Sequence, residues 1–336
     1  MRFTSKRYSR GFRRRKRRMR IDGFLVVDKP EGWTSIEVVQ KIKSWFSIKR
    51  AGHIGTLDPF ATGVLPVVLN EGRRIVPFLK EDPKEYEAEM KLGEETTTDD
   101  LTGEPLFQRP LNEVTPEKIR EVFHTFVGKI RQTPPLFSAV KVQGVPLYQW
   151  ARKGIEKERQ ERVVEVFRLE VEEITLPKIR FNLVCSKGTY VRALARDIGR
   201  RLGCGAHLTS LRRLRSGPFS LDQAISMEAL KSSSKASFSH WVISPEEALS
   251  DTPELKADER MIRKVSQGQG IGLKDLGQKS LPDFKKGQEL RMSSSEGKLV
   301  AILRCERDRE EIDQICPEEA IFRPIRVLST RIFMDR

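Results

Sequence analysis

Asp58 is the residue whose setting in the sequence first points to chemistry. It lies in RAGHIGTLDPFATGVLP, residues 50–66, behind two glycines and directly before Pro59. Glycine and proline at this density predict a turning loop rather than a regular helix or strand. A carboxylate on such a loop either bonds nearby amides as a turn residue or acts as a nucleophile or charge stabiliser. Taken alone, the segment favours the turn residue.

Two further segments place aromatic and basic side chains where they could serve a site. In EYEAEMKLG, residues 85–93, strict alternation predicts a strand with Tyr86 on its inward face. In TYVRALARDIGRRLG, residues 189–203, the spacing predicts a helix whose first turn carries Tyr190 and Arg192. Each has an ordinary structural interpretation as well: Tyr86 as a core residue, and Tyr190 with Arg192 as first-turn residues in an ion pair.

The surrounding pattern predicts the elements that would hold these residues. FLVVDK starts as a short strand, and Thr34 with Glu37 three residues later predicts a capped helix. A proline start and an apolar stripe predict another helix within residues 115–128. Further elements are expected at 63–69 (a buried segment), near 163–172 and 179–185 (strands), and at 189–203 (a helix capped by Thr189 and ended by Gly203).

Composition divides the chain into three parts. Residues 1–20 hold eleven Lys or Arg and no acid, which predicts a disordered basic tail. Residues 21–250 are expected to form the main domain, with an extended arm at 130–160 marked by its prolines and glycines. The serine-rich segment 231–240 is predicted to be a linker or an exposed loop. Short strands separated by Gly and Pro predict a small β domain at 251–336.

The net charge of +15 suggests a polyanionic partner, with nucleic acid as the first choice. A membrane surface is the rival, but the basic tail lacks an apolar face and no stretch approaches eighteen apolar residues. The tail also lacks the apolar centre of a signal peptide, although a targeting peptide stays open. Four cysteines without a CxxC pair predict a reducing, cytoplasmic location.

Six blocks of the sequence, in order over residues 22–225, resemble the bacterial tRNA pseudouridine-55 synthases, the TruB family. They are DKPEGWTS, GHIGTLDPFATGVL, KEYEAEMKLG with TTTDDLTG, QTPPLFSAVKVQGVPLYQWARKG, CSKGTYVRALARDIG and GCGAHLTSLRRLRSG. The resemblance implies an α+β, pseudouridine synthase fold: a mixed, mostly antiparallel sheet flanked by helices, with a cleft across its centre. It also implies a small C-terminal PUA-like, RNA-binding β domain at 251–336.

The resemblance further implies that the chain isomerises uridine to pseudouridine at position 55 of the tRNA T loop, by base flipping and without a cofactor. Asp58 becomes the essential carboxylate. Burial would raise the pKa of this carboxyl unless a cation stands nearby, and Arg192 is our candidate for that cation. The resemblance assigns base stacking and proton handling to Tyr86 and Tyr190, the base pocket to Leu211, and contact with the flipped nucleotide or its neighbours to His53.

Basic side chains at family positions are expected to contact RNA phosphates, which position the RNA without reading its sequence. They are Lys29, Arg74, Lys141, Arg152, Lys187, Arg212 and Arg213. Arg74 departs from the lysine that is usual in the family, so its geometry is open. We expect tRNA as the partner, with no guide RNA, no membrane and a monomeric protein. The alternatives are a guide-dependent or otherwise specific pseudouridine synthase and a tRNA chaperone.

Overall fold

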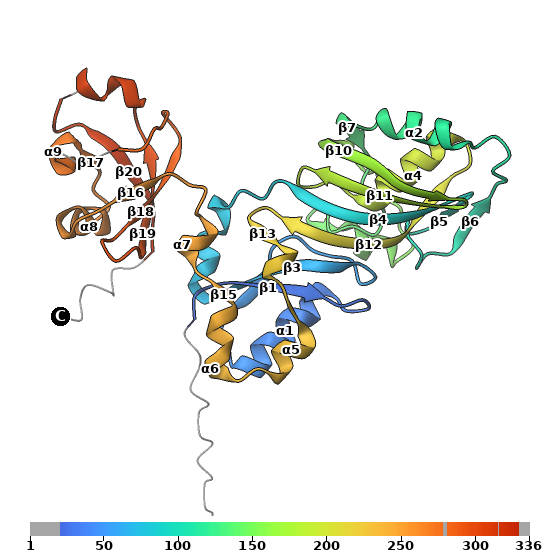
Figure 1. Ribbon diagram of the computed structural model, residues 1–336, viewed down its shortest axis with the longest axis horizontal. Helices are drawn as coiled ribbons and strands as arrows, with labels where there is room; N and C mark the ends of the chain where they lie inside the picture. Colours follow the sequence, from blue (N-terminus) through green and yellow to red (C-terminus); the bar gives the residue numbers. More distant parts are fainter. Residues whose placement is uncertain (1–20, 278–280, 315, 329–336) are drawn as a thin grey trace, which may run out of the picture.

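The structure is a computed structural model that describes residues 21–277, 281–314 and 316–328. The basic tail expected at 1–20 lies outside the described residues. Figure 1 shows a large body built on one long sheet, and a smaller sheet at the C-terminal end, joined to it through the segment around α7 (Pro245–Ala248). Among the described residues, no helix has the length and apolar character needed to cross a membrane.

The large sheet positions the site. Within the described residues it has 11 strands, and its main path runs β14-β1-β3-β12-β4-β11-β10-β7. Most neighbours are antiparallel, whereas β12 lies parallel to β3 and β14 parallel to β1, so the expected mixed, mostly antiparallel sheet is confirmed. The strands are β1 (Gly23–Lys29), β2 (Ala51–His53), β3 (Thr62–Leu69), β4 (Lys84–Leu92), β7 (Gly128–Gln132), β10 (Arg162–Thr175), β11 (Lys178–Cys185), β12 (Ala206–Ser216), β13 (Phe219–Ser220), β14 (Ile225–Ser226) and β15 (Val242–Ile243).

The longer helices begin and end close to where the sequence predicts. α1 (Ser35–Phe46) has the expected capping box between Thr34 and Glu37. α2 (Pro116–His124) starts at the expected proline. α4 (Val191–Leu202) ends at Gly203, which takes a left-handed φ of 84°. The predicted Thr189 cap is wrong, because Tyr190 occupies the N-cap position and Thr189 instead donates to Ser186 O at 2.9 Å.

The serine-rich segment 231–240, predicted to be a linker or an exposed loop, is largely exposed but helical. It folds into the end of α5 (Met227–Ser232), α6 (Lys235–Phe238) and the start of η4 (Ser239–Trp241). Phe238 is fully buried and its ring stacks on Phe46 of α1 with centroids 4.0 Å apart. One buried aromatic side chain therefore outweighs the polar composition around it.

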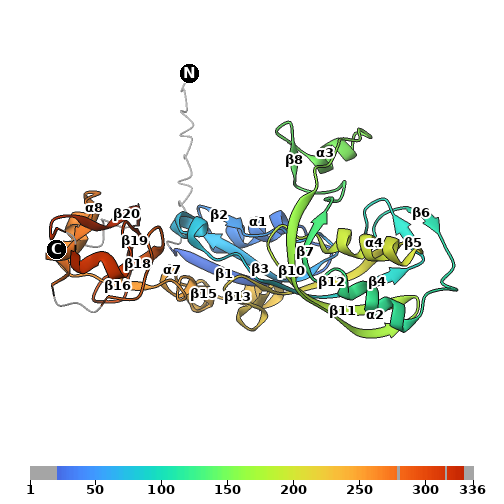
Figure 2. The ribbon, with the colours of Figure 1, turned by 90° about the horizontal axis from the view of Figure 1, so that it is seen from above.

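Residues 133–161 leave the sheet between β7 and β10 and stand away from it as an arm, which Figure 2 shows from above. The arm contains β8 (Lys141–Val142), β9 (Val145–Pro146) and α3 (Leu147–Ala151). A second small ribbon, β5 (Glu94–Thr96) with β6 (Pro105–Gln108), lies at the end of β4.

The C-terminal part has its own sheet and its own apolar core. Within the described residues the sheet order is β16-β18-β19-β20-β17. Its elements are β16 (Glu254–Lys256), α8 (Glu259–Ser266), β17 (Ile271–Gly272), α9 (Leu273–Leu276), β18 (Glu289–Ser293), β19 (Leu299–Cys305), η5 (Arg309–Gln314) and β20 (Ala320–Val327). Leu299 and Ile302 also pack in one cluster with Phe24 and Val26 of β1, so the two bodies share an apolar contact.

Candidate active site

The loop that carries Asp58 is held in place from both sides. Ser35 Oγ donates to Leu57 O at 3.0 Å and accepts from Leu57 N at 3.0 Å. On the other side of Asp58, Gly32 N donates to Pro59 O at 2.8 Å. The Asp58 side chain keeps 34% of its surface exposed. The loop therefore presents a partly open carboxylate on a rigid backbone.

Arg192 is the cation that faces this carboxylate, as expected from the family resemblance. Its Nη2 donates to Asp58 Oδ1 at 3.2 Å, and its Nε lies 2.9 Å from Oδ2 as an ion pair rather than an aligned hydrogen bond. The remaining donors go to Thr98 O at 2.8 Å and Phe137 O at 2.9 Å. Arg192 also lies 3.2 Å from Asp100 Oδ2, so one buried guanidinium is shared by two carboxylates.

Burial and these neighbours set the electrostatics of Asp58. Burial raises the pKa of the Asp58 carboxyl, Arg192 opposes the rise, and the negative charge of Asp100 adds to it. A carboxylate with a raised pKa is a stronger nucleophile and base than a free one, while the guanidinium favours its ionised form. Asp100 was not singled out from the sequence, where it read only as part of the polar turn TTTDD.

Tyr86 lies on the inward face of β4, and its side chain is buried, as expected. Across the sheet it pairs with Arg213 of β12, whose guanidinium lies close enough to influence the pKa of the phenol. Burial raises the pKa of Tyr86, and Arg213 opposes that rise. Arg213 is only 1% exposed, and it donates to Val64 O at 2.7 Å and Gly55 O at 2.8 Å. Arg213, predicted to contact an RNA phosphate, is instead held in the interior by backbone carbonyls.

Lys29 is a second correction. Its side chain is fully buried, and Nζ donates to Pro30 O at 2.9 Å, Trp33 O at 2.7 Å and Pro59 O at 3.0 Å. Burial lowers its pKa from 10.5 to about 8, against an opposing effect of the Asp58 charge. Lys29 does not face RNA as predicted; it fastens the loop that carries Asp58.

Tyr190, Leu211 and His53 lie on the elements around this pair. Tyr190 is half-buried, and Gln132 binds its backbone through both N–H and C=O, at 2.8 and 3.1 Å. Burial raises the pKa of its phenol. Leu211 is buried on β12 opposite Ala88. His53 ends β2, and its buried Nδ1 has no hydrogen-bond partner within the described part of the chain.

The other predicted phosphate contacts fall in different places. Lys141 and Arg152 are exposed on the arm. Arg212 pairs with Asp28 at 2.8 Å, and Lys187 Nζ lies 3.4 Å from Glu81 Oε1.

Arg74 contacts backbone carbonyls at the end of the C-terminal sheet. Its Nη2 donates to Val327 O at 2.7 Å and its Nη1 to Leu328 O at 3.3 Å. Its guanidinium therefore ties the large body to the last strand of the C-terminal sheet.

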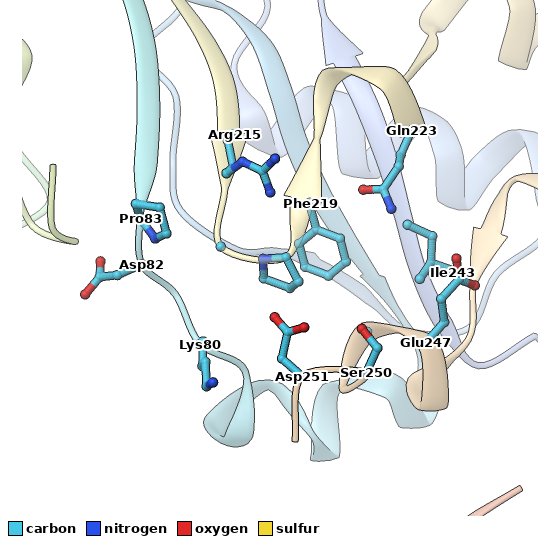
Figure 3. A pocket seen from close by; sticks show the side chains of 13 residues that line it. Lys80, Asp82, Pro83, Arg215, Phe219, Gln223, Ile243, Glu247, Ser250 and Asp251 are labelled. Atoms are coloured by element: carbon cyan, nitrogen blue, oxygen red, sulfur yellow. The ribbon is translucent and has the colours of Figure 1, made fainter. Parts of the chain in front are cut away.

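A polar pocket of about 390 Å³ opens elsewhere, where β13 meets the segment around α7 (Figure 3). Lys80, Phe219 and Asp251 are among its lining residues, whereas Asp58, Tyr86 and Arg192 are not. It is therefore separate from the predicted site. In the described residues, no group of three or more His, Cys, Asp or Glu side chains is placed to hold a metal ion.

A mixed sheet with a central loop aspartate, a guanidinium paired to it and a phenol on the neighbouring strand defines an enzyme of the pseudouridine synthase fold. Residues 43–191 match the TruB family pseudouridylate synthase N terminal domain, and residues 192–249 match the tRNA pseudouridylate synthase B C-terminal domain. The chain belongs to the TruB family of pseudouridylate synthases.

Individual relatives agree with this assignment. A tRNA pseudouridine synthase B from Geobacter sulfurreducens is 49% identical over 249 residues, 74% of this chain and 82% of that protein. One from Syntrophus aciditrophicus is 40% identical and covers 94% of this chain and 100% of that protein. Among solved structures, a Cbf5-Nop10-Gar1 complex has a chain that is 29% identical with a TM-score of 0.70, covering 92% of this chain and 86% of that one.

Proposed function

We propose that this protein isomerises uridine to pseudouridine at position 55 in the T loop of tRNA, with Asp58 as the essential carboxylate. The observation that carries the proposal is the ion pair between Asp58 and Arg192, on a rigid but partly open loop. The reaction breaks the bond between the sugar C1′ and N1 of uracil and forms one between C1′ and C5. The hydrogen on C5 leaves as a proton and N1 gains one, so the change involves no net redox step.

Asp58 acts either as the nucleophile or as the stabiliser of the electron-poor sugar during this exchange. Arg192 holds the carboxylate ionised and aimed. Tyr86 and Tyr190 cover the flipped base and handle the C5 proton, and Leu211 closes the base pocket. Flipping costs about a few kcal/mol of lost stacking, which these aromatic and apolar surfaces offset.

Binding of the tRNA involves the surface around the site. The arm, residues 133–161, carries the exposed Lys141 and Arg152, which are free to meet phosphates. The C-terminal sheet serves as a PUA-like RNA-binding domain, and the basic tail at 1–20 adds electrostatic capture. We further propose that the protein works as a monomer, in the cytoplasm and without a guide RNA.

The experiment measures release of tritium from tRNA transcript labelled at uracil C5, with the bare transcript and no guide RNA. Wild-type protein should release one equivalent at the T-loop uridine, and Asp58→Asn should release none while it still binds tRNA. Fully active Asp58→Asn protein would refute the mechanism. No release by wild type, with tRNA binding intact, would favour the chaperone, and release that requires a guide RNA would favour a guide-dependent enzyme.

A further inference from the structure

Beside the Asp58 loop, polar groups from two neighbouring strands converge on Gly55. A Cβ placed on Gly55 would stand 3.1 Å from Lys84 Nζ, 3.3 Å from Arg213 Nη1 and 3.8 Å from Ser216 Oγ. Gly55 has a left-handed φ of 68°, and its missing side chain leaves room for these groups against the loop. An ammonium and a hydroxyl thus point at one place, with a guanidinium behind them.

Within the described residues, no acid directly contacts the Lys84 ammonium at this place. Lys84 is only 9% exposed, yet within the described residues its Nζ has no hydrogen-bond or ion-pair partner. The nearest acids are already engaged: Glu81 pairs with Lys187 Nζ, and Asp82 accepts the backbone N–H of Lys187. Burial lowers the pKa of Lys84, and the charge of Arg213 lowers it further. Burying one cation next to another costs stability, so we expect an anionic ligand to bind beside Lys84.

The position of Lys84 on β4 indicates which kind of anionic ligand would bind there. Lys84 lies two residues before Tyr86 on the same face of β4, and Ser216 is its partner on β12. Residues two apart on a strand are separated by about 7 Å. Because Tyr86 belongs to the base pocket, Lys84 lies about as far from the flipped base as a nucleotide's phosphate lies from its own pyrimidine. His53, with its unpartnered Nδ1, lies close enough to Arg213 for that charge to lower its pKa.

We propose that Lys84 and Ser216 bind a backbone phosphodiester that flanks the flipped uridine. Backbone carbonyls hold the Arg213 guanidinium through Nε and Nη2, and its charge strengthens the positive field behind Lys84. The phosphate would complete the charge pairing that the free protein lacks. The inference rests on the proposed function, because it assumes that the nucleotide enters the Asp58 site.

The test uses T-stem-loop RNA in which one phosphate at a time, on either side of the target uridine, is replaced by a neutral methylphosphonate. Wild-type protein should lose about tenfold or more in affinity at one of these phosphates. Lys84→Met should lose a similar factor with unmodified RNA. The same methylphosphonate should then cost the variant little more, because both changes remove one interaction. Lys80→Met, at an exposed lysine outside the site, is the matched control and should keep the full methylphosphonate effect.

Chemical unfolding separates binding from folding. Since Lys84 is buried without a partner beside Arg213, Lys84→Met should be at least as stable as wild type. A destabilised Lys84→Met protein, or penalties that add in full, would overturn the inference and leave Lys84 a structural residue. Wild type that neither binds nor modifies the unmodified RNA would instead refute the proposed function.

Discussion

Replacement of Arg192 tests whether its guanidinium controls the ionisation of Asp58. Arg192 meets the two carboxylate oxygens at 2.9 and 3.2 Å while it is only 4% exposed. Removing one partner of a buried ion pair costs about 3–5 kcal/mol, so Arg192→Met forfeits an interaction of about that size with Asp58. If the transition state needs that interaction in full, the rate falls about 10²- to 10⁴-fold. Arg192→Lys keeps one point contact and should lose about 10- to 100-fold.

The pH dependence gives the sharper measurement. In the wild type, burial raises the pKa of Asp58 while Arg192 opposes the rise. In Arg192→Met, burial and the charge of Asp100 remain and both raise it. The carboxylate is the active form, so activity is lost as the pH falls through this pKa. The acid limb of single-turnover rates should therefore move to higher pH in the variant.

A control on the same helix makes the result decisive. Arg196 is also buried on α4, where it pairs with Asp99 at 2.8 Å rather than with Asp58. Arg196→Met should lower stability but leave the acid limb in place. If Arg192→Met kept the wild-type limb, or if both variants moved it equally, the assigned role of Arg192 would be wrong.

Three further changes test how the structure is held. The pKa of Lys29 is about 8 in the folded protein and 10.5 in the unfolded chain, so its buried charge opposes folding below pH 8. This cost is relieved as the pH rises from about 8 to 10.5. In urea unfolding, the stability of wild type relative to Lys29→Met should therefore rise by about 3 kcal/mol over that range. Arg74→Ala should speed limited proteolysis between the two bodies, whereas the exposed Arg73→Ala should not; equal rates would remove Arg74 from the domain contact. Phe238→Ala should destabilise the protein by about 3–5 kcal/mol because its ring is buried on Phe46. A loss under about 1 kcal/mol would show that residues 231–240 behave as a linker.

Local patterns predicted much of the fold because each depends on residues close in sequence. The capping box at Thr34, the alternation through Tyr86 and the helix after Tyr190 all appear where expected. Each of these signals contains both partners of the interaction within a few residues. The pairing of Asp58 with Arg192 joins residues 134 apart, and the resemblance to known sequences, rather than any local pattern, predicted it.

Charged residues that become buried could not be predicted in the same way. Lys29 and Arg213 read as surface cations, because lysine and arginine are seldom fully buried. Their acceptors are backbone carbonyls such as Pro59 O and Val64 O, which only the folded chain brings to them. The sequence shows which side chains are charged, but it does not show where the fold leaves backbone carbonyls without a partner.

The two aspartates of TTTDD show the same limit on a smaller scale. Asp99 takes a left-handed φ of 61°, which turns adjacent carboxylates in different directions. Asp99 then pairs with Arg196, while Asp100 pairs with Arg192. No residue type in the turn decides which aspartate reaches the reaction centre, so the second acid on Arg192 came only from the structure.

The buried cations also explain how Asp58 can be sheltered and still charged. Backbone carbonyls satisfy the donors of Lys29 and Arg213 but carry no net charge, so both positive charges remain felt nearby. Burial raises the pKa of Asp58, and the charges of Arg192 and Lys29 oppose that rise. Burial lowers the pKa of Arg213, and the charge of Asp58 is among the effects that oppose this. Together, Lys29, Arg213 and Arg192 create a positive electrostatic potential that the Asp58 carboxylate only partly neutralises. Such a setting keeps the catalytic anion ionised and, with the same field, attracts the phosphate backbone that must approach it.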